Sequence, residues 1–217
     1  KAFQNDLLNN ASLPIPLGKK VFNPLADSRF NRYKNFVNTE EIVVDLSLSM
    51  CFPLVIKKSR SSLAQGVYIV KDATELESQL RKIFEQSAYA DNVLIVQEYV
   101  LGQEYRAVAS QGDILLAYHK QGTVNESQDL NPLHQQDGKA VPVKSGPLFN
   151  ELSDLAKRIS DVIDLGFYAF DVIFNEHGPK ILELNPNPFC HYYNKSNGRA
   201  DFISIYKQLV TKHIVNI

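Results

Sequence analysis

A predicted β-hairpin near the C-terminus constrains this chain more than any other segment. Its strands are residues 170–174 (FDVIF) and 181–186 (ILELNP), and residues 175–178 (NEHG) form the turn. Glu183 and Asn185 are two residues apart, so their side chains leave the same face of the strand, and a hairpin brings Asp171 alongside them. Two carboxylates and an amide oxygen on an apolar sheet suit Mg²⁺ shared with phosphate oxygens. A hairpin that simply carries polar residues on its wet face is the plainer alternative.

The composition is that of an ordinary globular protein with one large or two small domains. The chain has 217 residues, a formal net charge of −1 and no long run of either charge sign, so neither nucleic acid nor a membrane surface is expected as a main partner. No apolar stretch approaches the roughly 20 residues that cross a bilayer. Cys51 and Cys190 do not make a disulfide framework, which favours a reducing, cytoplasmic location. The chain begins at Lys1 and has one methionine, which leaves open whether it is a fragment.

Hydrophobic periodicity predicts an α+β protein with mainly antiparallel sheets. Segments 18–38 and 122–146 show no clear period, so we expect long loops there, the first with short pieces of structure. Because strands mostly follow one another without crossover helices, antiparallel pairing is favoured. We expect helices at 1–10, 39–49, after 72–75, at 152–163 and around 202–210, and strands at 53–57, 66–70, 93–100, 104–109, 114–119 and in the hairpin.

A lysine at the end of an apolar strand introduces the first candidate nucleotide-binding element. Lys57 closes the strand 53–57 and is followed by a polar loop that includes Ser59 and Ser62. A point charge beside hydroxyl groups and backbone N–H donors suits a phosphate group. A solvated lysine pair at a strand end is the alternative, and the loop is poor in glycine.

The second candidate element is residues 96–106 (VQEYVLGQEYR), an apolar strand that turns at a glycine into another strand. Glu104 on the outgoing strand could accept hydrogen bonds from ribose hydroxyls, and Arg106 shares its face. The alternative is an ion pair at the edge of a ladder, which would contribute about 0–1 kcal/mol.

These elements, taken in order along nearly the whole chain, resemble the ATP-grasp superfamily. The motifs that carry the resemblance are Pro53-x-Val55-x-Lys57, Gly66-Val67, residues 97–104 (QEYVLGQE), Asp171 and Glu183-x-Asn185. The resemblance implies an α+β fold in which two subdomains with mainly antiparallel sheets grip ATP between them. It also implies a ligase that activates a carboxylate as an acyl phosphate, joins it to an amine, and releases ADP and phosphate. The implied domains are an N-terminal helix and loop (1–38), a small subdomain (39–100) and a large subdomain with the metal site (101–217).

The resemblance assigns each site residue a role. Lys57, with Ser59 and Ser62, would bind phosphates, residues 97–100 would read adenine through their backbone, and Glu104 would bind ribose. Lys120 would lie near the transferred phosphate and Arg106 would stabilise the reacting acyl group. One or two Mg²⁺ ions would be held by the metal ligands. In full, the implied cofactor-binding residues are Lys57, Ser59, Ser62, Gln97, Glu98, Tyr99, Val100 and Glu104, the catalytic residues Arg106 and Lys120, and the metal ligands Asp171, Glu183 and Asn185.

Within the superfamily, Glu104-Tyr105-Arg106 and residues 194–201 (NKSNGRAD) are similar to the enzymes that add glutamate to ribosomal protein tails and to cyanophycin synthetase. The loop 59–62 is similar to that of D-alanine–D-alanine ligases. Those enzymes carry an arginine two residues before the metal aspartate, where this chain has Ala169. The first branch is therefore favoured.

The substrates implied are a small-molecule or peptide carboxylate and an amine. Family members usually have a further N-terminal domain completing the substrate cleft, so such a domain or a homodimer partner is expected to supply that wall. A catalytically silent ATP-binding module is the alternative from another functional class. A thiol acceptor is a third, but Cys190 is expected in the core and His191 on the surface.

Overall fold

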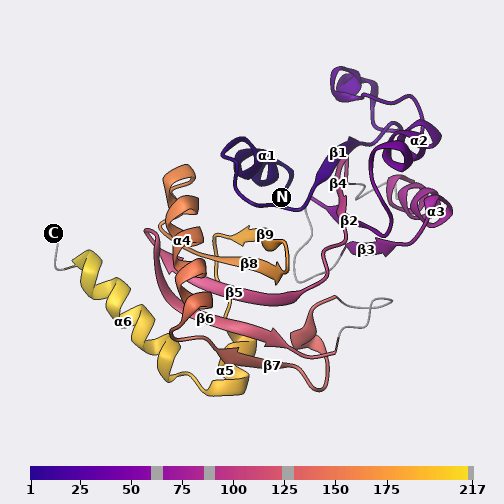
Figure 1. Cartoon of the computed structure of the whole chain (residues 1–217). Coiled ribbons are helices and arrows are strands. Elements are labelled where there is room, and N and C mark those ends of the chain that lie inside the picture. The colour runs from indigo at the N-terminus through magenta and orange to yellow at the C-terminus, as the bar shows by residue number, and fades with distance from the viewer. Residues whose placement is uncertain (60–65, 86–90, 124–129, 215–217) are drawn as a thin grey trace. The chain divides into compact units, whose positions relative to one another are not determined.

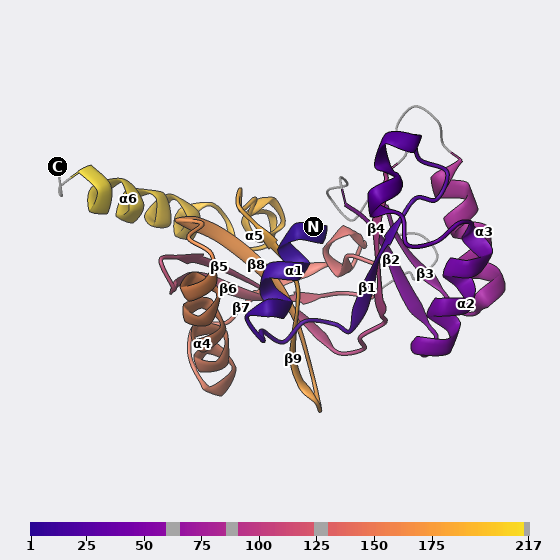
Figure 2. The ribbon, with the colours of Figure 1, turned by 90° about the horizontal axis from the view of Figure 1, so that it is seen from above.

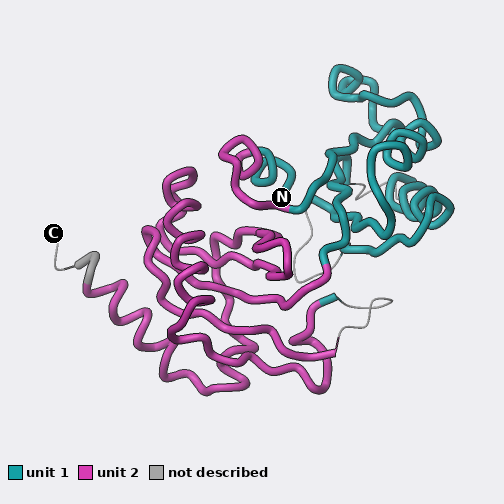
Figure 3. Tube along the Cα trace, in the orientation of Figure 1, with its two compact units in different colours: residues 1–6, 16–100, 126–130 teal, residues 7–15, 101–125, 131–217 magenta. Residues whose placement is uncertain are grey.

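The chain folds into two compact units, each built around its own antiparallel sheet. Unit 1 comprises residues 1–6, 16–100 and 126–130, and unit 2 comprises residues 7–15, 101–125 and 131–217 (Figure 3). The computed structural model describes residues 1–59, 66–85, 91–123 and 130–214, with side chains as far as residue 211. Within those ranges no helix has the length and apolar character to cross a membrane.

Unit 1 contains a four-stranded sheet in the order β1-β4-β2-β3. Every neighbouring pair in it is antiparallel. Two helices lie side by side on one face of this sheet (Figures 1 and 2). The elements are β1 (Gly18–Phe22), η1 (Ser28–Tyr33), α2 (Thr39–Ser49), β2 (Leu54–Lys58), β3 (Val67–Val70), α3 (Ala73–Phe84) and β4 (Val93–Glu98).

Side-chain alternation along β2 and β4 separates the two faces of the unit 1 sheet. Leu54 and Ile56 of β2 join Leu94 and Val96 of β4 in a buried core with residues of α2 and α3. The intervening residues of these strands therefore point to the opposite face. Those residues are Val55, Lys57, Ile95 and Gln97.

Side-chain caps begin both helices of unit 1. The Asp72 carboxylate accepts from the Glu75 N–H at 2.9 Å at the start of α3. The Glu75 carboxylate reaches one residue further back than a capping box would, to the Lys71 N–H at 2.8 Å. Helix α2 begins at Thr39, as predicted, and Asn38 caps it by accepting from the Glu41 N–H at 2.9 Å.

Unit 2 contains a five-stranded antiparallel sheet in the order β7-β6-β5-β8-β9. Helix α4 lies on one face, and α5 with the start of α6 lies on the other (Figures 1 and 2). Helix α1 begins in unit 1 and continues into unit 2, where Leu8 is buried with residues of α4. The elements are α1 (Ala2–Asn10), β5 (Gln103–Ser110), β6 (Asp113–Gln121), η2 (Pro132–His134), β7 (Lys139–Pro142), α4 (Pro147–Val162), β8 (Phe167–Asn175), β9 (Gly178–Asn185), α5 (His191–Asn197) and α6 (Ala200–Ile214).

The predicted loops at 18–38 and 122–146 each contain a strand that the sequence pattern did not reveal. These strands, β1 and β7, lie at sheet edges and each buries a single residue, Val21 and Ala140 respectively. One buried residue gives no alternation to detect. Helix α5 was missed as well, and its side chains cover the outer edge of β7: Ser196 Oγ accepts from the Ala140 N–H at 3.1 Å, and Asn197 Nδ2 donates to the Ala140 carbonyl at 2.8 Å. The other predicted helices and strands are confirmed to within a few residues.

Candidate functional site

A row of side chains crosses four neighbouring strands of the unit 2 sheet. Arg106 of β5 is the register partner of Tyr118 of β6 on one side and of Asp171 of β8 on the other. Asp171 is in turn the partner of Glu183 of β9. Directly opposed residues on adjacent strands point to the same face of a sheet. The predicted catalytic arginine and two predicted metal ligands therefore lie side by side.

This row continues an apolar face of the sheet that is covered by α5 and α6. Val108, Leu116 and Ala169 lie two residues from members of the row and are buried in a core with Tyr193 of α5 and Ile205 of α6. Because residues two apart on a strand share a face, the polar row and this core occupy one side of the sheet. The sequence thus places apolar residues under the helices and charged residues beyond them.

Asp171 is the centre of a buried ionic network. Arg106 holds both of its oxygens, with Nε donating to Oδ1 at 2.8 Å and Nη2 donating to Oδ2 at 2.7 Å. Lys120 Nζ lies 2.9 Å from Oδ1 of Asp171 and also donates to Glu104. Asp171 and Lys120 are 4% and 6% exposed. Two cations and two carboxylates are thereby withdrawn from water together, which is tolerable only because they are paired.

The network shifts the proton affinities of its members in opposite directions. Burial by itself would raise the pKa of Asp171, but Arg106 and Lys120 outweigh it and hold that pKa below its ordinary value. Burial would lower the pKa of Lys120, yet Asp171 and Glu104 keep it above its ordinary value. For Glu104 burial prevails over the attraction of Lys120, so its pKa is raised. Asp171 is consequently the stronger acid of the two carboxyl groups.

Glu183 and Asn185 extend the same face along β9. Asn185 Nδ2 donates to Glu183 Oε1 at 3.3 Å, and both side chains are half-buried. The described residues contain no cluster of three or more His, Cys, Asp and Glu side chains placed to hold a metal ion by themselves. Two carboxylates and one amide oxygen nevertheless fit Mg²⁺, which keeps waters and substrate phosphates among its ligands.

A change in strand pairing accompanies this set of ligands. Asp171 pairs with Glu183, but the next residue, Val172, pairs with Ile181, so Leu182 is the extra residue of a β-bulge. Bulges of this kind bend a strand and re-aim the side chains beside them. The bulge lies immediately next to Glu183, which allows β9 to present Glu183 and Asn185 where β8 presents Asp171.

Two of the predicted nucleotide-binding residues share one face of the unit 1 sheet. Lys57 of β2 is the register partner of Ile95, and Gln97 of β4 is the partner of Val55, so both lie on the face opposite α2 and α3. Gln97 is also paired with Gly18 of β1. A Cβ atom at position 18 would lie 2.6 Å from Gln97 Cγ, so the glycine is what lets β1 approach this side chain.

Unit 1 also contains buried polar atoms that lack hydrogen-bond partners. Among the described residues these atoms are Ser59 Oγ and Gln97 Oε1 in unit 1 and Asn194 Oδ1 in unit 2. A buried acceptor without a partner costs about 1–3 kcal/mol, so such atoms need an explanation. Ser59 and Gln97 are both predicted to bind the nucleotide, which makes a polar ligand a good explanation. Ser62 lies outside the described residues.

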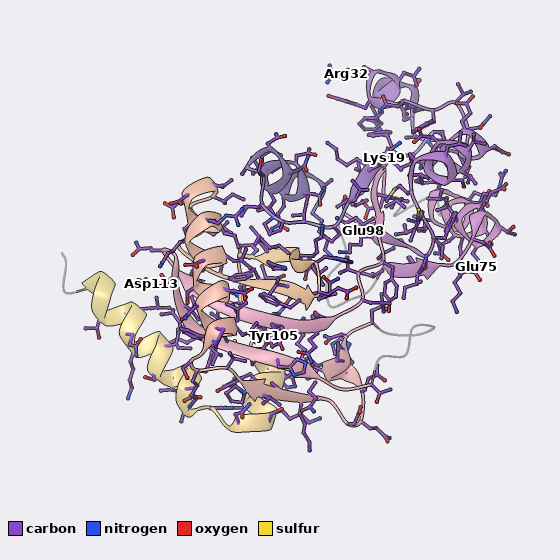
Figure 4. All side chains as sticks on the ribbon, viewed as in Figure 1. Lys19, Arg32, Glu75, Glu98, Tyr105 and Asp113 are labelled. Carbon is purple, nitrogen blue, oxygen red and sulfur yellow. The ribbon has the colours of Figure 1, made fainter. Side chains whose placement is uncertain are left out.

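The predicted adenine-binding segment begins at the end of β4. The backbone N–H groups of Glu98 and Tyr99 donate to the carbonyls of Leu17 at 2.8 Å and of Pro53 at 3.2 Å. The Glu98 carboxylate accepts from the Leu17 N–H at 2.9 Å, and Figure 4 shows Glu98 in this part of unit 1. These bonds fix the course of the chain toward Val100, which is half-buried.

Sequence reasoning missed two groups beside the arginine. Tyr118 lies in the same row, and burial raises its pKa to about 12; its position two residues before Lys120 on one strand could have revealed it. The Phe189 carbonyl accepts from Arg106 Nη1 at 3.3 Å, a backbone contact that no residue pattern announces. Cys190 is buried and its pKa is raised to about 11 by burial, so the expectation of a core cysteine is confirmed, as is an exposed His191.

Comparisons with known proteins find ligases that are similar to this chain. A probable alpha-L-glutamate ligase of Maridesulfovibrio salexigens is 28% identical over 139 residues, covering 63% of this chain and 43% of the relative. A D-alanine–D-alanine ligase of Glaesserella parasuis is 26% identical over 178 residues, covering 76% of this chain and 53% of the relative. The crystal structure of a D-alanine–D-alanine ligase from Bacillus anthracis complexed with ATP matches with a TM-score of 0.62 and 20% identity, over 97% of this chain and 63% of that one.

The chain spans about half the length of the curated relatives that it matches. The structural match confirms the predicted α+β fold. The model of the RimK-like ATP-grasp domain matches residues 27–211, which is most of the sequence. The chain therefore belongs to the RimK-like ATP-grasp family.

Proposed function

We propose that this chain carries the nucleotide- and metal-binding part of an ATP-dependent ligase that joins a carboxylate to an amine. The observation that supports it most is the charged face of unit 2, where Arg106, Lys120, Asp171 and Glu183 come together on four neighbouring strands. Phosphoryl transfer needs charge neutralisation and positioning more than a covalent nucleophile, and this face supplies both. The ligases among its relatives point to the same chemistry.

The metal ligands in this proposal are Asp171, Glu183 and Asn185. Mg²⁺ bound there would supply the positive charge that offsets the charge on the phosphate oxygens during transfer. Lys120 lies against Asp171 and would add a fixed positive charge beside the transferred phosphoryl group. Asp171 and Glu104 raise the pKa of Lys120 above its ordinary value despite its burial, so the lysine stays protonated, as this role requires.

The nucleotide-binding groups in this proposal come mainly from unit 1. Lys57 and Ser59, with Ser62, would contact phosphates, and Glu104 of unit 2 would bind the ribose. The carbonyls of residues 97–99 and the amide of Val100 would read adenine, because the N–H groups of Glu98 and Tyr99 already have backbone partners. The Gln97 amide oxygen is buried without a partner and is the side-chain atom best suited to accept from the base.

The proposed reaction has two steps. A substrate carboxylate oxygen attacks the γ-phosphorus of ATP, which forms an acyl phosphate and ADP. The amine then attacks the acyl carbon, a proton leaves the nitrogen, and inorganic phosphate departs with the electrons of the broken C–O bond. Arg106 would stabilise the oxyanion of this second step through charge-assisted hydrogen bonds.

The substrate class that we propose is that of the glutamate-adding ligases, acting on a small-molecule or peptide carboxylate and an amine. Where dipeptide ligases have an arginine, this chain has Ala169, which is fully buried in the core under α5 and α6. We also propose that residues 1–38, 39–100 and 101–217 are the functional divisions of the chain. A further domain or a second subunit would complete the substrate site, and the enzyme would act in the cytoplasm.

Product analysis tests this function. The protein is incubated with ATP, Mg²⁺ and pools of amino acids, nucleotides are separated by chromatography, and amides are identified by mass spectrometry. We expect ADP and phosphate with a new amide. AMP as the nucleotide product would refute the acyl-phosphate mechanism. Nucleotide binding without turnover in the protein with its complete substrate-side domain would instead indicate a silent ATP-binding module.

A further inference from the structure

Both oxygens of the Asp171 carboxylate are held by cationic protein groups. It receives three charge-assisted contacts, two from the fork of Arg106 at 2.8 and 2.7 Å and one from Lys120 at 2.9 Å. A carboxylate offers about four acceptor positions, and a bidentate guanidinium occupies the two that lie side by side. A divalent ion at about 2.0–2.1 Å from either oxygen would place another cation beside the guanidinium and draw on the same negative charge. Arg106 and a metal ion would therefore compete for Asp171.

Arg106 has a second contact that does not depend on Asp171. Its Nη1 donates to the Phe189 carbonyl at 3.3 Å, on the segment that follows β9. The side chain is 18% exposed, whereas that of Asp171 is 5% exposed. The arginine is therefore the more accessible member of the pair, and the Phe189 carbonyl is a partner for it that does not depend on Asp171. Released from Asp171, Nε and Nη2 of Arg106 would present a fork that matches another carboxylate or an acyl phosphate.

We infer that Arg106 is the counter-ion that a divalent metal ion replaces on Asp171, so that metal loading releases the arginine for the carboxylate substrate. The inference rests on the proposed function and adds to it the order in which metal, nucleotide and substrate bind. Arg106 gives up Asp171 when metal and nucleotide bind, and the liberated guanidinium completes the site for the substrate carboxylate. Lys120 keeps its bond to Glu104 throughout, which preserves one positive charge beside the phosphates.

The coupling between metal and nucleotide binding tests this exchange. ADP affinity is measured by calorimetry with Mn²⁺ and with EDTA, and the ratio of the two affinities is compared between variants. If Arg106 competes with the metal, Arg106→Gln should raise that ratio about tenfold, the scale of one lost charge-assisted contact. Arg106→Lys keeps the charge but loses the fork, so it should raise the ratio by a smaller factor. Arg158→Gln is the matched control, because Arg158 lies on α4, which covers the other face of the same sheet, and donates to the Ser12 carbonyl at 3.1 Å.

A second measurement reports on the arginine itself. In ¹H–¹⁵N spectra of the wild-type protein, the Arg106 Nε–H signal is assigned by its loss in Arg106→Gln. It should shift when ADP and Mg²⁺ are added together and stay in place with ADP and EDTA. This shift would not be expected of a residue that merely supports the fold, and it does not require any variant to fold beyond the one used for assignment.

The outcomes separate this inference from the function on which it rests. Wild-type protein that binds no nucleotide in the presence of metal would overturn both. Wild-type protein that binds metal and nucleotide, with an affinity ratio that is unchanged or lower in both Arg106 variants, would overturn the inference alone. The same holds if the Nε–H signal does not move on metal loading.

Discussion

The two sheets of this chain offer a ligand different kinds of polar group. On the unit 2 sheet, Arg106, Lys120, Glu104 and Asp171 form ion pairs with side chains that are 5–18% exposed. On the unit 1 sheet, the face opposite α2 and α3 holds Lys57 and also Gln97, whose amide oxygen is buried without a partner. A buried ionic network is costly to disrupt and creates a strong local electric field. A neutral acceptor instead contributes mainly to the recognition of a ligand through a hydrogen bond. We therefore expect the largest effects on reaction rate and stability from substitutions in the unit 2 network, and an effect mainly on nucleotide affinity from substitution of Gln97.

The largest effect on stability should follow from breaking the unit 2 network at Lys120. Lys120→Met leaves Asp171 and Glu104 buried with one cation fewer, and we expect a loss of roughly 3–5 kcal/mol in the free energy of unfolding. The control is Lys157→Met in the same unit, whose pair with Asp154 at 3.8 Å is exposed and should contribute less than about 1 kcal/mol. Urea denaturation of both variants measures the two losses in the free energy of unfolding. Equal losses would show that burial of the network has no energetic consequence.

Glu183→Gln should have the largest effect on rate. The substitution keeps the shape of the side chain but removes a negative charge from the proposed metal site. That charge contributes more to stabilisation as the phosphoryl group is transferred. We expect kcat to fall roughly 10²–10³-fold, the scale seen when one electrostatic contact to a transition state is removed, with a much smaller change in nucleotide affinity. If nucleotide affinity falls as far as kcat, Glu183 contributes to ground-state binding instead.

Glu104→Ala distinguishes two roles for this residue, a contact to ribose and the positioning of Lys120. A ribose contact is made equally in the ground and transition states, so its loss should raise the KM for ATP with little change in kcat. The structure also pairs Glu104 with Lys120, and a residue that only positions this lysine would lower kcat instead. Steady-state kinetics at varied ATP separate the two results. We expect the change in KM.

Gln97→Met should have the smallest effect on stability and a measurable one on affinity. Methionine keeps the length of the side chain and removes a buried oxygen without a partner, but it also loses the 3.0 Å bond from Gln97 Nε2 to Asn5. These two changes oppose one another, so we expect the free energy of unfolding to change by less than about 1 kcal/mol. Nucleotide affinity should fall several-fold. Unchanged affinity would remove Gln97 from the proposed binding site.

The sequence predicted the placement of site residues where that placement depends on residues close together in the chain. The shared face of Glu183 and Asn185 follows from their spacing alone, and a short turn brings Asp171 to the same place. The pairing of Arg106 with Asp171 could not be foreseen, because it depends on the register of two strands 65 residues apart. The extra residue Leu182 depends on tertiary structure in the same way.

In unit 1, sequence-based prediction failed for other reasons. The strand that contains Gly18 is short, lies at a sheet edge and buries one residue, so it carries no periodic signal. The buried oxygen of Gln97 is recognisable only when its surroundings are known. Sequence patterns reveal which residue types are available, whereas the absence of a hydrogen-bond partner is a property of the folded protein.

The dependence of nucleotide binding on metal tests the account most directly. Titration calorimetry with a non-hydrolysable ATP analogue is carried out with Mg²⁺ and with EDTA, on the wild-type protein and on Asp171→Asn. If Asp171, Glu183 and Asn185 hold the metal with the phosphates, EDTA should weaken binding to the wild-type protein substantially, and the variant should have lost most of this difference. Equal affinity of the wild-type protein with and without Mg²⁺ would contradict the assignment of the charged face of unit 2 as the metal–phosphate site.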